Sequence, residues 1–404
     1  MANNNILLVG LQYDSNLGDR AIFMCAKRML ADILSDLGLF DYEIREMDMT
    51  GRAEIGQNPV NKQARLPFTR KVVRKLGHVF HISGTNAWAV SYRCRKAAVI
   101  QCDKFCDAHT KAIIFAGGGI IKYKYLNFHD YLVAIIGYAQ KHHIPVMLSA
   151  AGVEGYDERN ASCRRLKKAL NSECVRAIST RDDIHTLTQL YCRKHSDIKT
   201  ALAADPACSI SRYYPIRISE HERIIGLGVV RETLFTDNGI NFDKSRMLRL
   251  WAELYHEINR NGYRCKLFCN GTKADYLFAE DLLAYMGIEN KDGSVLTERP
   301  TSIEELTQTI TGCSGIIAGR LHASVIAYSY SIPSVGLVWN EKQTMFGKAI
   351  GCENRFFSVD EFDPSEIVKV LMSSMDEGYD ENARKKYCAT TGTEIRRFLN
   401  DVLI

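Results

Sequence analysis

The first half of the chain alternates between short apolar runs and longer stretches in which apolar residues recur every three or four positions. The short runs predict buried strands, and the longer period predicts amphipathic helices. The runs lie at 5–10, 41–49, 111–116, 145–153, 176–180 and 198–204, and the helical stretches lie at 19–37, 131–143, 158–172 and 181–191. This order predicts repeated βα units, which build a parallel sheet with helices on both faces.

The second half repeats the pattern after an interruption at 206–222, where we expect the linker. Gly262 is placed to end one helix, and Ser302 is placed to cap the start of another. Strands are predicted at 223–230, 263–271, 315–320 and 333–339. Helices are predicted at 245–262, 275–287, 302–312, 322–331 and 380–403, the last as one long helix or two.

The two series predict an α/β protein with two Rossmann-like βαβ domains, residues 1–212 and 213–404, that face each other across a cleft. A length of 404 residues agrees with more than one domain. The sequence leaves open whether the C-terminal helix packs back on the first domain. Ligands of parallel sheets bind beyond the carboxyl ends of the strands, so functional residues are expected there.

The composition is that of an ordinary globular protein, with 46% hydrophobic and 25% charged residues. The start of the chain lacks the basic stretch and long apolar run of a signal peptide, so we expect a cytoplasmic protein. The thirteen cysteines are scattered, which predicts free thiols rather than disulfides. Cys102 and Cys106 have helical spacing, and no second pair stands at zinc-site spacing, so no metal is expected.

Positive charge gathers in the segment 50–111. It holds twelve Lys/Arg against three Asp/Glu, a net charge of +9, whereas the remaining residues carry −4. Apolar residues such as Phe68, Val72 and Trp88 are interleaved with the charges. One interpretation is a solvated helix face; the sharper one is a surface that meets anionic lipid or a phosphorylated, lipid-linked substrate. Without a recognised nucleic-acid motif, a nucleic-acid partner is not expected.

The turn after the first strand carries Asn16, Gly18 and Asp19. Gly18 allows a close backbone approach, Asn16 can cap the helix, and Asp19 opens it. Free amides at this helix start suit an anion, although a well-capped turn accounts for the same residues.

Two further strand ends of the first domain carry candidate ligand groups. Gly117, Gly118 and Gly119 predict a loop that lets a phosphate, carboxylate or sugar approach the backbone, unless they serve turn formation alone. Arg181 opens "RDD" at a helix start, where a cation is disfavoured. This position suggests a ligand group or, alternatively, a salt bridge to a nearby aspartate.

The second domain repeats the theme with Arg231, Asn270 and Lys342 at strand ends. The strongest pair is Arg320 and His322 in "AGRLHA", which share a side if the backbone there is extended. Arginine suits bidentate capture of phosphate or carboxylate, and histidine suits proton transfer near neutral pH. The alternative is a buried structural histidine and an interdomain salt bridge. Together these residues predict a pocket for a small, multiply charged anion.

Several motifs, in order, resemble the polysaccharide pyruvyl transferases. They are "NLGDRAI" at 16–22, "AGGG" at 116–119, "ISTRDD" at 178–183, "DPA" at 205–207 and "GRLHASVIAYSYSIPSVGLVWNEKQTMFG" at 319–347. The resemblance implies a two-domain fold similar to the B-type glycosyltransferases. It also implies transfer of pyruvate from phosphoenolpyruvate to a hexose of a surface or capsular polysaccharide precursor, with formation of a cyclic ketal and no cofactor.

The resemblance also assigns residues. Arg320 and His322 match the family's Arg-x-His pair, Lys342 its downstream lysine, Arg181 the basic residue of "TRDD", and Asn16, Gly18 and Asp19 its Asn-x-Gly-Asp turn. The family commonly has Tyr and Asp before the lysine, and this chain departs from it with Trp339, Asn340 and Glu341.

These matches give a mechanistic hypothesis. Arg320 and Lys342, with help from Arg181, hold the phosphate and carboxylate of phosphoenolpyruvate. His322 is the acid/base group, and Asp19 is a weaker candidate for activating an acceptor hydroxyl. The first domain then serves a glycan acceptor, whose linkage to polyisoprenyl diphosphate stays open, as does peripheral contact with an anionic membrane. The alternatives are a nucleotide-sugar-dependent glycosyltransferase and a non-enzymatic anion-binding protein.

Overall fold

The computed structural model describes residues 3–55, 57, 85–124, 127–192, 197–216 and 223–404. The chain divides into two compact units. Unit 1 comprises Met1–Asp14, Ile22–Ala204 and Thr390–Ile404, and unit 2 comprises Ser15–Ala21 and Asp205–Ala389. The short segment Ser15–Ala21 therefore groups with residues far from it in the sequence, which the hydrophobic pattern did not predict.

Unit 1 contains a seven-stranded sheet in the order β2-β1-β3-β5-β6-β7, with β4 paired to β5. All these pairs are parallel. The inner strands β1, β3 and β5 are apolar runs buried on both sides, as expected for a covered parallel sheet. Their bounds are β1 (Asn4–Gly10), β2 (Tyr42–Asp48), β3 (Thr110–Phe115), β4 (Gly118–Lys122), β5 (Val146–Glu154), β6 (Val175–Thr180) and β7 (Lys199–Leu202).

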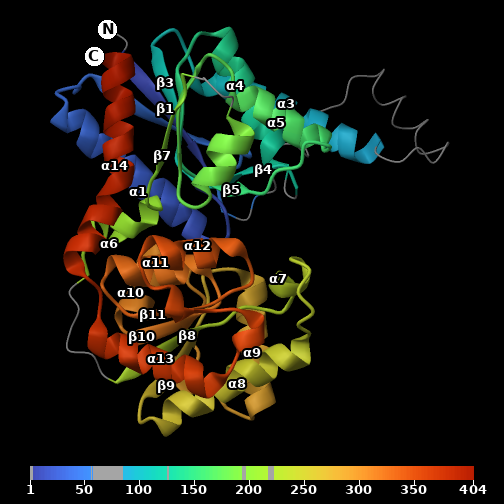
Figure 1. The fold of residues 1–404 in the computed structure, drawn as a ribbon, viewed down its shortest axis with the longest axis vertical. Coiled ribbons are helices and arrows are strands. Elements are labelled where there is room, and N and C mark those ends of the chain that lie inside the picture. Colours follow the sequence, from blue (N-terminus) through green and yellow to red (C-terminus); the bar gives the residue numbers. More distant parts are fainter. Residues whose placement is uncertain (1–2, 56, 58–84, 125–126, 193–196, 217–222) are drawn as a thin grey trace. The chain divides into compact units, whose positions relative to one another are not determined.

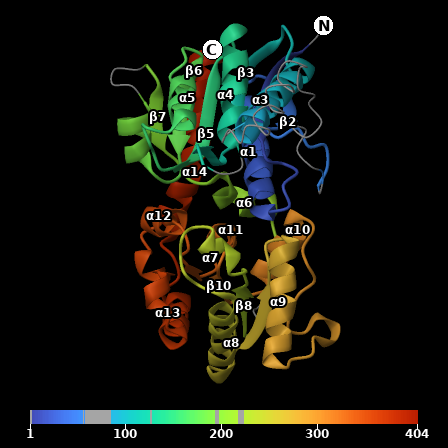
Figure 2. The same ribbon diagram turned by 90° about the vertical axis from the view of Figure 1, so that its right-hand side faces the viewer.

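Helices cover both faces of this sheet. Helices α3, α4 and α5 pack in sequence on one face, and α1 lies with the last part of α14 on the other, where Gly392 packs on Met29 (Figure 1, Figure 2). The bounds are α1 (Leu17–Asp36), α3 (Thr85–Phe105), α4 (Phe128–Lys141), α5 (Ala161–Leu170), the π-helical turn η2 (Thr186–Tyr191) and α14 (Glu381–Leu403).

Unit 2 contains a five-stranded parallel sheet in the order β12-β11-β10-β8-β9. Helices α11 and α13 both contact β10 and β11, and they lie on opposite sides of these strands (Figure 1). The strands are β8 (Ile224–Gly228), β9 (Arg264–Phe268), β10 (Gly315–Ala318), β11 (Ser334–Leu337) and β12 (Phe356–Phe357). The helices are α6 (Ile210–Tyr213), α7 (Thr233–Thr236), α8 (Lys244–Arg260), α9 (Lys273–Met286), α10 (Ile303–Thr311), α11 (Leu321–Ser329), α12 (Glu341–Ala349) and α13 (Pro364–Glu377), with a 3₁₀ turn η3 (Pro206–Ser209).

The predicted fold class is confirmed: the protein is α/β, with two βα units built on parallel sheets. Ser302 caps α10 by accepting a hydrogen bond from the Glu305 amide, and Gly262 follows α8 with a positive φ, as predicted. All thirteen cysteines are free thiols. None of the helices that the structure describes combines the length and apolarity needed to cross a membrane.

The three-glycine segment differs from its prediction. Gly117 and Gly118 have positive φ, which suits glycine, but Gly118 and Gly119 open strand β4 rather than forming a loop. The reason is that β5 extends beyond its pairing with β3, and β4 pairs with this free edge.

Candidate active site

Two neighbouring strands of unit 2 deliver an arginine each to the same edge of the sheet. Strands β8 and β10 pair in parallel with Gly228 opposite Ala318, and the Gly319 amide continues the ladder to the Gly228 carbonyl at 2.9 Å. A Cβ on Gly319 would lie 2.4 Å from a Val230 methyl carbon, so only glycine permits this approach. Because both strands end at this level, Arg231 and Arg320 emerge side by side.

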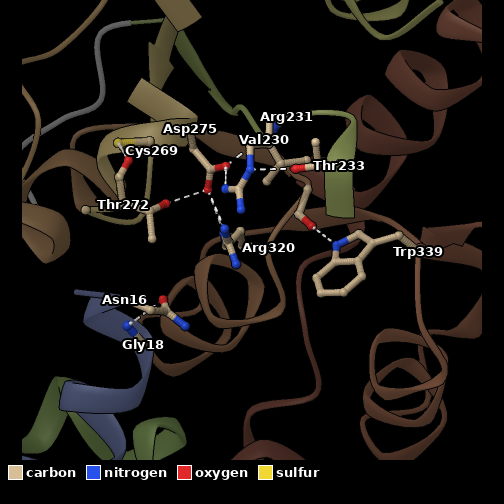
Figure 3. A network of polar contacts seen from close by, with 12 residues as sticks. Asn16, Gly18, Val230, Arg231, Thr233, Cys269, Thr272, Asp275, Arg320 and Trp339 are labelled. Carbon is tan, nitrogen blue, oxygen red and sulfur yellow. Dashed lines mark hydrogen bonds and ion pairs between the residues drawn. The ribbon is translucent and has the colours of Figure 1, made fainter. Parts of the chain in front are cut away.

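Asp275 joins these two arginines. It is the third residue of α9, the helix that follows β9, and its side chain is fully buried. Its Oδ1 accepts from Arg231 Nη1 at 2.8 Å, and its Oδ2 accepts from Arg320 Nε and Nη2 at 2.8 and 2.6 Å. Thr272 Oγ1 donates to the same Oδ2 at 2.6 Å (Figure 3). The carboxylate thus lies between the two guanidinium groups.

The charge of this group is not balanced. One buried carboxylate faces two guanidinium groups, which leaves a net charge of +1. A second contact fixes Arg231, whose Nε donates to Thr233 Oγ1 at 2.6 Å. Within the part of the chain that the structure describes, Nη1 of Arg320 and Nη2 of Arg231 have no hydrogen-bond partner. Two such donors beside excess positive charge suit an anionic ligand.

His322 is held by different residues. The backbone is extended at Arg320 but becomes helical at Leu321, so His322 is the second residue of α11. The idea that Arg320 and His322 share one side of an extended segment is therefore wrong. The His322 side chain is buried, with Nε2 at 3.6 Å from Asp205 Oδ2. Asp205 is itself buried and caps η3 through the Ala207 amide.

Gly18 provides the space that His322 occupies. A Cβ on Gly18 would lie 2.2 Å from His322 Nδ1, 2.3 Å from Cγ and 2.6 Å from Cβ. Asn16 fixes the turn, because its Oδ1 accepts from the Gly18 amide at 3.2 Å (Figure 3) and its Nδ2 donates to Asp19 Oδ2 at 2.9 Å. The structure thus brings the predicted turn residues to the predicted histidine.

The rest of segment 15–21 contacts the other residues of unit 2 through both backbone and side-chain atoms. The Leu17 amide donates to the Asn270 carbonyl at 3.1 Å, and Gly271 packs closely on the Leu17 side chain. Arg20 Nη1 donates to the Thr301 carbonyl at 2.8 Å. Asn270 is buried, and its Nδ2 lacks a hydrogen-bond acceptor among the described residues. It is a donor near the predicted turn.

Trp339, one of the residues that depart from the family pattern, has a structural role. Trp339 Nε1 donates to the Gly319 carbonyl at 2.6 Å (Figure 3), and Gln343 Oε1 accepts from the Trp339 amide at 3.1 Å. These contacts fix the peptide just before Arg320. Asn340 precedes α12, and Lys342 is the half-buried second residue of that helix.

Arg181 and the three glycines lie in unit 1. Arg181 follows β6 and is buried. The next residue, Asp182, accepts through Oδ1 from the Val153 and Asp183 amides at 2.8 Å. It therefore links the turn after β6 to the neighbouring strand β5. The expected roles of Arg181, Gly117, Gly118 and Gly119 in substrate binding stay predictions.

The sequence assigned no site role to Asp275, Thr272 or Trp339. Asp205 entered through the motif "DPA" and as one of the aspartates that a salt bridge from Arg181 could reach. The pattern "TKAD" at 272–275 reads as an ordinary helix start with an acidic residue in its first turn. Among the described residues no cluster of three or more His, Cys, Asp or Glu suits a metal ion.

A family model described as polysaccharide pyruvyl transferase matches residues 16–341. That span includes both arginines, Asp275, His322 and the Asn16 turn. No curated protein sequence matches the chain.

Solved structures resemble the whole chain at low identity. A UDP-GlcNAc 2-epimerase from Methanocaldococcus jannaschii has a TM-score of 0.60 at 9% identity, covering 98% of this chain and 99% of that one. The Neisseria meningitidis UDP-GlcNAc 2-epimerase has a TM-score of 0.55 at 12% identity, covering 98% and 100%. A glycosyltransferase from Rickettsia africae has a TM-score of 0.50 at 11% identity, covering 100% and 99%. These likenesses confirm the predicted resemblance to the B-type glycosyltransferase fold.

Proposed function

The chain belongs to the polysaccharide pyruvyl transferase family, and we propose that it moves pyruvate from phosphoenolpyruvate onto a hexose of a surface or capsular polysaccharide precursor, forming a cyclic ketal. The observation that carries the proposal is the pairing of Arg231 and Arg320 on the buried Asp275 carboxylate, at the strand edge where α11 places His322. This group offers the positive charge and directed donors that a small dianion needs.

These residues are best suited to binding the donor substrate. Phosphoenolpyruvate carries a phosphate and a carboxylate on a three-carbon enol, and both groups accept paired hydrogen bonds from guanidinium nitrogens. Nη1 of Arg320 and Nη2 of Arg231, which have no hydrogen-bond partner among the described residues, supply such donors. We assign Lys342 and the uncharged donor Asn270 Nδ2 to the same ligand, and no cofactor is required.

The chemistry needs one proton donor and two acceptors of protons. Protonation of C3 makes C2 electrophilic; a sugar hydroxyl adds to C2 and loses its proton; the C2–O bond to phosphate breaks; and a second hydroxyl closes the ketal. One hydroxyl proton is thus balanced by the proton on C3, and the other leaves with phosphate. We assign the C3 proton to His322, with Asp205 positioned to stabilise the imidazolium. Asp19 stays the weaker candidate for activating an acceptor hydroxyl.

The donor assignment has a direct test. Purified protein is incubated with candidate glycan acceptors and either phosphoenolpyruvate or nucleotide sugars, and the products are analysed by mass spectrometry. We expect a mass gain equal to pyruvic acid minus one water, together with release of inorganic phosphate. A gain of one sugar residue with release of a nucleotide would instead identify a glycosyltransferase. Anion binding without any product would identify a binding protein.

The acceptor is proposed to meet unit 1 at the cytoplasmic face of a membrane. The described part of α3 exposes Trp88, Val99 and Ile100, and Trp88 stacks on Tyr92 with ring centroids 6.4 Å apart. These positions and the exposed Lys96 recur at three- and four-residue spacing, so they form one stripe along the helix. Aromatic, aliphatic and basic side chains in such a stripe suit the headgroup region of a bilayer and a polyisoprenyl-diphosphate-linked acceptor.

Vesicle binding tests the membrane proposal. Arg70 and Lys71 belong to the basic segment and lie outside the described residues, as do Arg74 and Lys75. We expect Arg70→Gln/Lys71→Gln to weaken binding to phosphatidylglycerol vesicles, because each basic residue near the surface contributes about 1 kcal/mol. Lys385→Gln/Lys386→Gln on α14 removes the same charge from exposed positions and is the matched control. Equal loss in both variants, or no binding by the unmodified protein, contradicts the membrane proposal and leaves the transfer reaction untouched.

A further inference from the structure

We propose that Asp275 is a positioning residue for the donor site: its buried carboxylate turns two separate arginines into one convergent anion-binding pair. The inference rests on the proposed function, because it concerns the same ligand. It assigns a role to a residue that never touches the substrate. The juxtaposition that supports it is a single fully buried carboxylate with hydrogen bonds to Arg231 and Arg320.

The Asp275 carboxylate accepts hydrogen bonds from three residues. Asp275 accepts from Nη1 and the amide of Arg231, from Nε and Nη2 of Arg320, and from the Thr272 hydroxyl. With these partners Asp275 has little remaining capacity to bind a ligand, and as an anion it would repel one. Its contacts instead restrict the rotation of both guanidinium groups.

Both arginines keep a nitrogen that these contacts do not use. Arg320 uses Nε and Nη2 on Asp275, and Arg231 uses Nη1 on Asp275 and Nε on Thr233. In the described residues, each arginine keeps one terminal nitrogen without a partner. The side chain of Arg231 is 29% exposed and that of Arg320 is 13% exposed, so solvent reaches the pair. Figure 3 shows both groups converging on the carboxylate.

Asp275 has an alternative role, in which it only neutralises part of the positive charge of the two arginines. If neutralisation were its only effect, removing its charge would strengthen anion binding, because the local charge would rise from +1 to +2. If it positions the arginines, removing it weakens anion binding in spite of the added positive charge. The two roles therefore predict opposite signs for the same substitution.

The test is Asp275→Asn, which keeps the size of the side chain. We measure the affinity for phosphoenolpyruvate and for inorganic phosphate by calorimetry, and the KM values for donor and acceptor. We expect the donor affinity to fall by about 10- to 100-fold, the range typical when a residue that orients a metal-binding side chain is removed, with the acceptor KM unchanged. Asp281→Asn is the matched control: it makes the same change on the same helix, where Asp281 pairs with Lys244 at the surface.

A double-mutant cycle separates positioning from general damage. Arg320→Lys should weaken donor binding strongly in the unmodified protein and little in the Asp275→Asn protein, because the alignment it disturbs is already lost. Full additivity of the two effects overturns the proposal. Tighter anion binding by Asp275→Asn also overturns it and assigns Asp275 to charge neutralisation.

Folding and the proposed function are controlled separately. If Asp275→Asn does not fold, as judged by circular dichroism, Thr272→Val provides a milder test, since it removes only the hydroxyl that orients the carboxylate. It should raise the donor KM alone, and an unchanged donor KM contradicts positioning. If the unmodified protein binds no phosphoenolpyruvate, the donor assignment itself fails. If it binds and converts phosphoenolpyruvate while both variants behave normally, only the role of Asp275 fails.

Discussion

Gly18→Ala should disable the proposed acid/base group without touching it chemically. The added Cβ would lie 2.2 Å from His322 Nδ1, whereas contacts below 3.4 Å are already tight for real Cβ atoms. The imidazole or the turn must therefore move by roughly 1.2 Å, and a misplacement of about 1 Å can reduce a rate by about 10²-fold. Gly18 does not have a positive φ, so the effect comes from this contact and not from backbone strain.

The assay is phosphate release from phosphoenolpyruvate with saturating acceptor, together with the melting temperature of each variant. We expect kcat to fall by about 10²-fold in Gly18→Ala, with a loss of stability of about 1–3 kcal/mol from overpacking. Gly137→Ala is the matched control, because a Cβ on Gly137, inside α4, meets no atom within 4 Å. That variant should be fully active and slightly more stable, since alanine favours the helix.

A second background tests the physical cause. In His322→Ala the imidazole is absent and only the contact with the residue-322 Cβ at 2.6 Å remains, so Gly18→Ala should destabilise this protein less than the unmodified one. The reasoning is refuted if Gly18→Ala keeps normal kcat, or if it destabilises the His322→Ala protein as much as the unmodified one. Either result would mean that the Gly18–His322 contact does not set the position of the imidazole.

Three further outcomes are expected. His322→Ala should fold and lose about 10²- to 10⁴-fold in turnover; near-normal turnover of a folded variant removes His322 from the mechanism. Arg320→Lys should raise the KM for phosphoenolpyruvate by about 10-fold or more, because hydrogen bonds between charged groups contribute about 1.5–3 kcal/mol; a change in the acceptor KM alone reverses the donor and acceptor assignments. Burial lowers the pKa of His129 below its usual 6.5; Asp130 opposes this shift and two arginines reinforce it. The unfolded chain therefore protonates His129 at a higher pH than the folded protein does, so the free energy of unfolding falls as the pH drops below about 6.5. His129→Gln should reduce that fall in melting temperature between pH 7.5 and 5.5, and an unchanged pH profile contradicts it.

The sequence predicted the fold well because its signals are local. Apolar runs, helical periods and caps such as Ser302 depend on neighbours within a few residues, and they place nearly every strand of both sheets. Strand β4 was missed because glycine normally weakens strands, and its pairing depends on a free edge of β5 more than thirty residues away. The division at segment 15–21 was missed for a related reason, since a hydrophobic pattern carries no information about which unit a turn joins.

The site residues differ in the same way: some could be predicted from local sequence signals, and others could not. Arg320, His322, Arg231 and the Asn16 turn could be proposed from the sequence, because each stands at the end of an apolar run. Asp275 could not, because an acidic residue in the first turn of a helix is favourable in any protein. Its meaning depends on the sheet order β10-β8-β9, in which β8 lies between β9 and β10 although β9 and β10 follow one another in the chain. That crossover brings the helix after β9 to the arginines that end β8 and β10, so a common helix-start residue becomes the shared partner of both cations. Strand order, rather than any motif, thus creates the convergent pair, and a substitution that leaves every motif intact can still dismantle the proposed donor site.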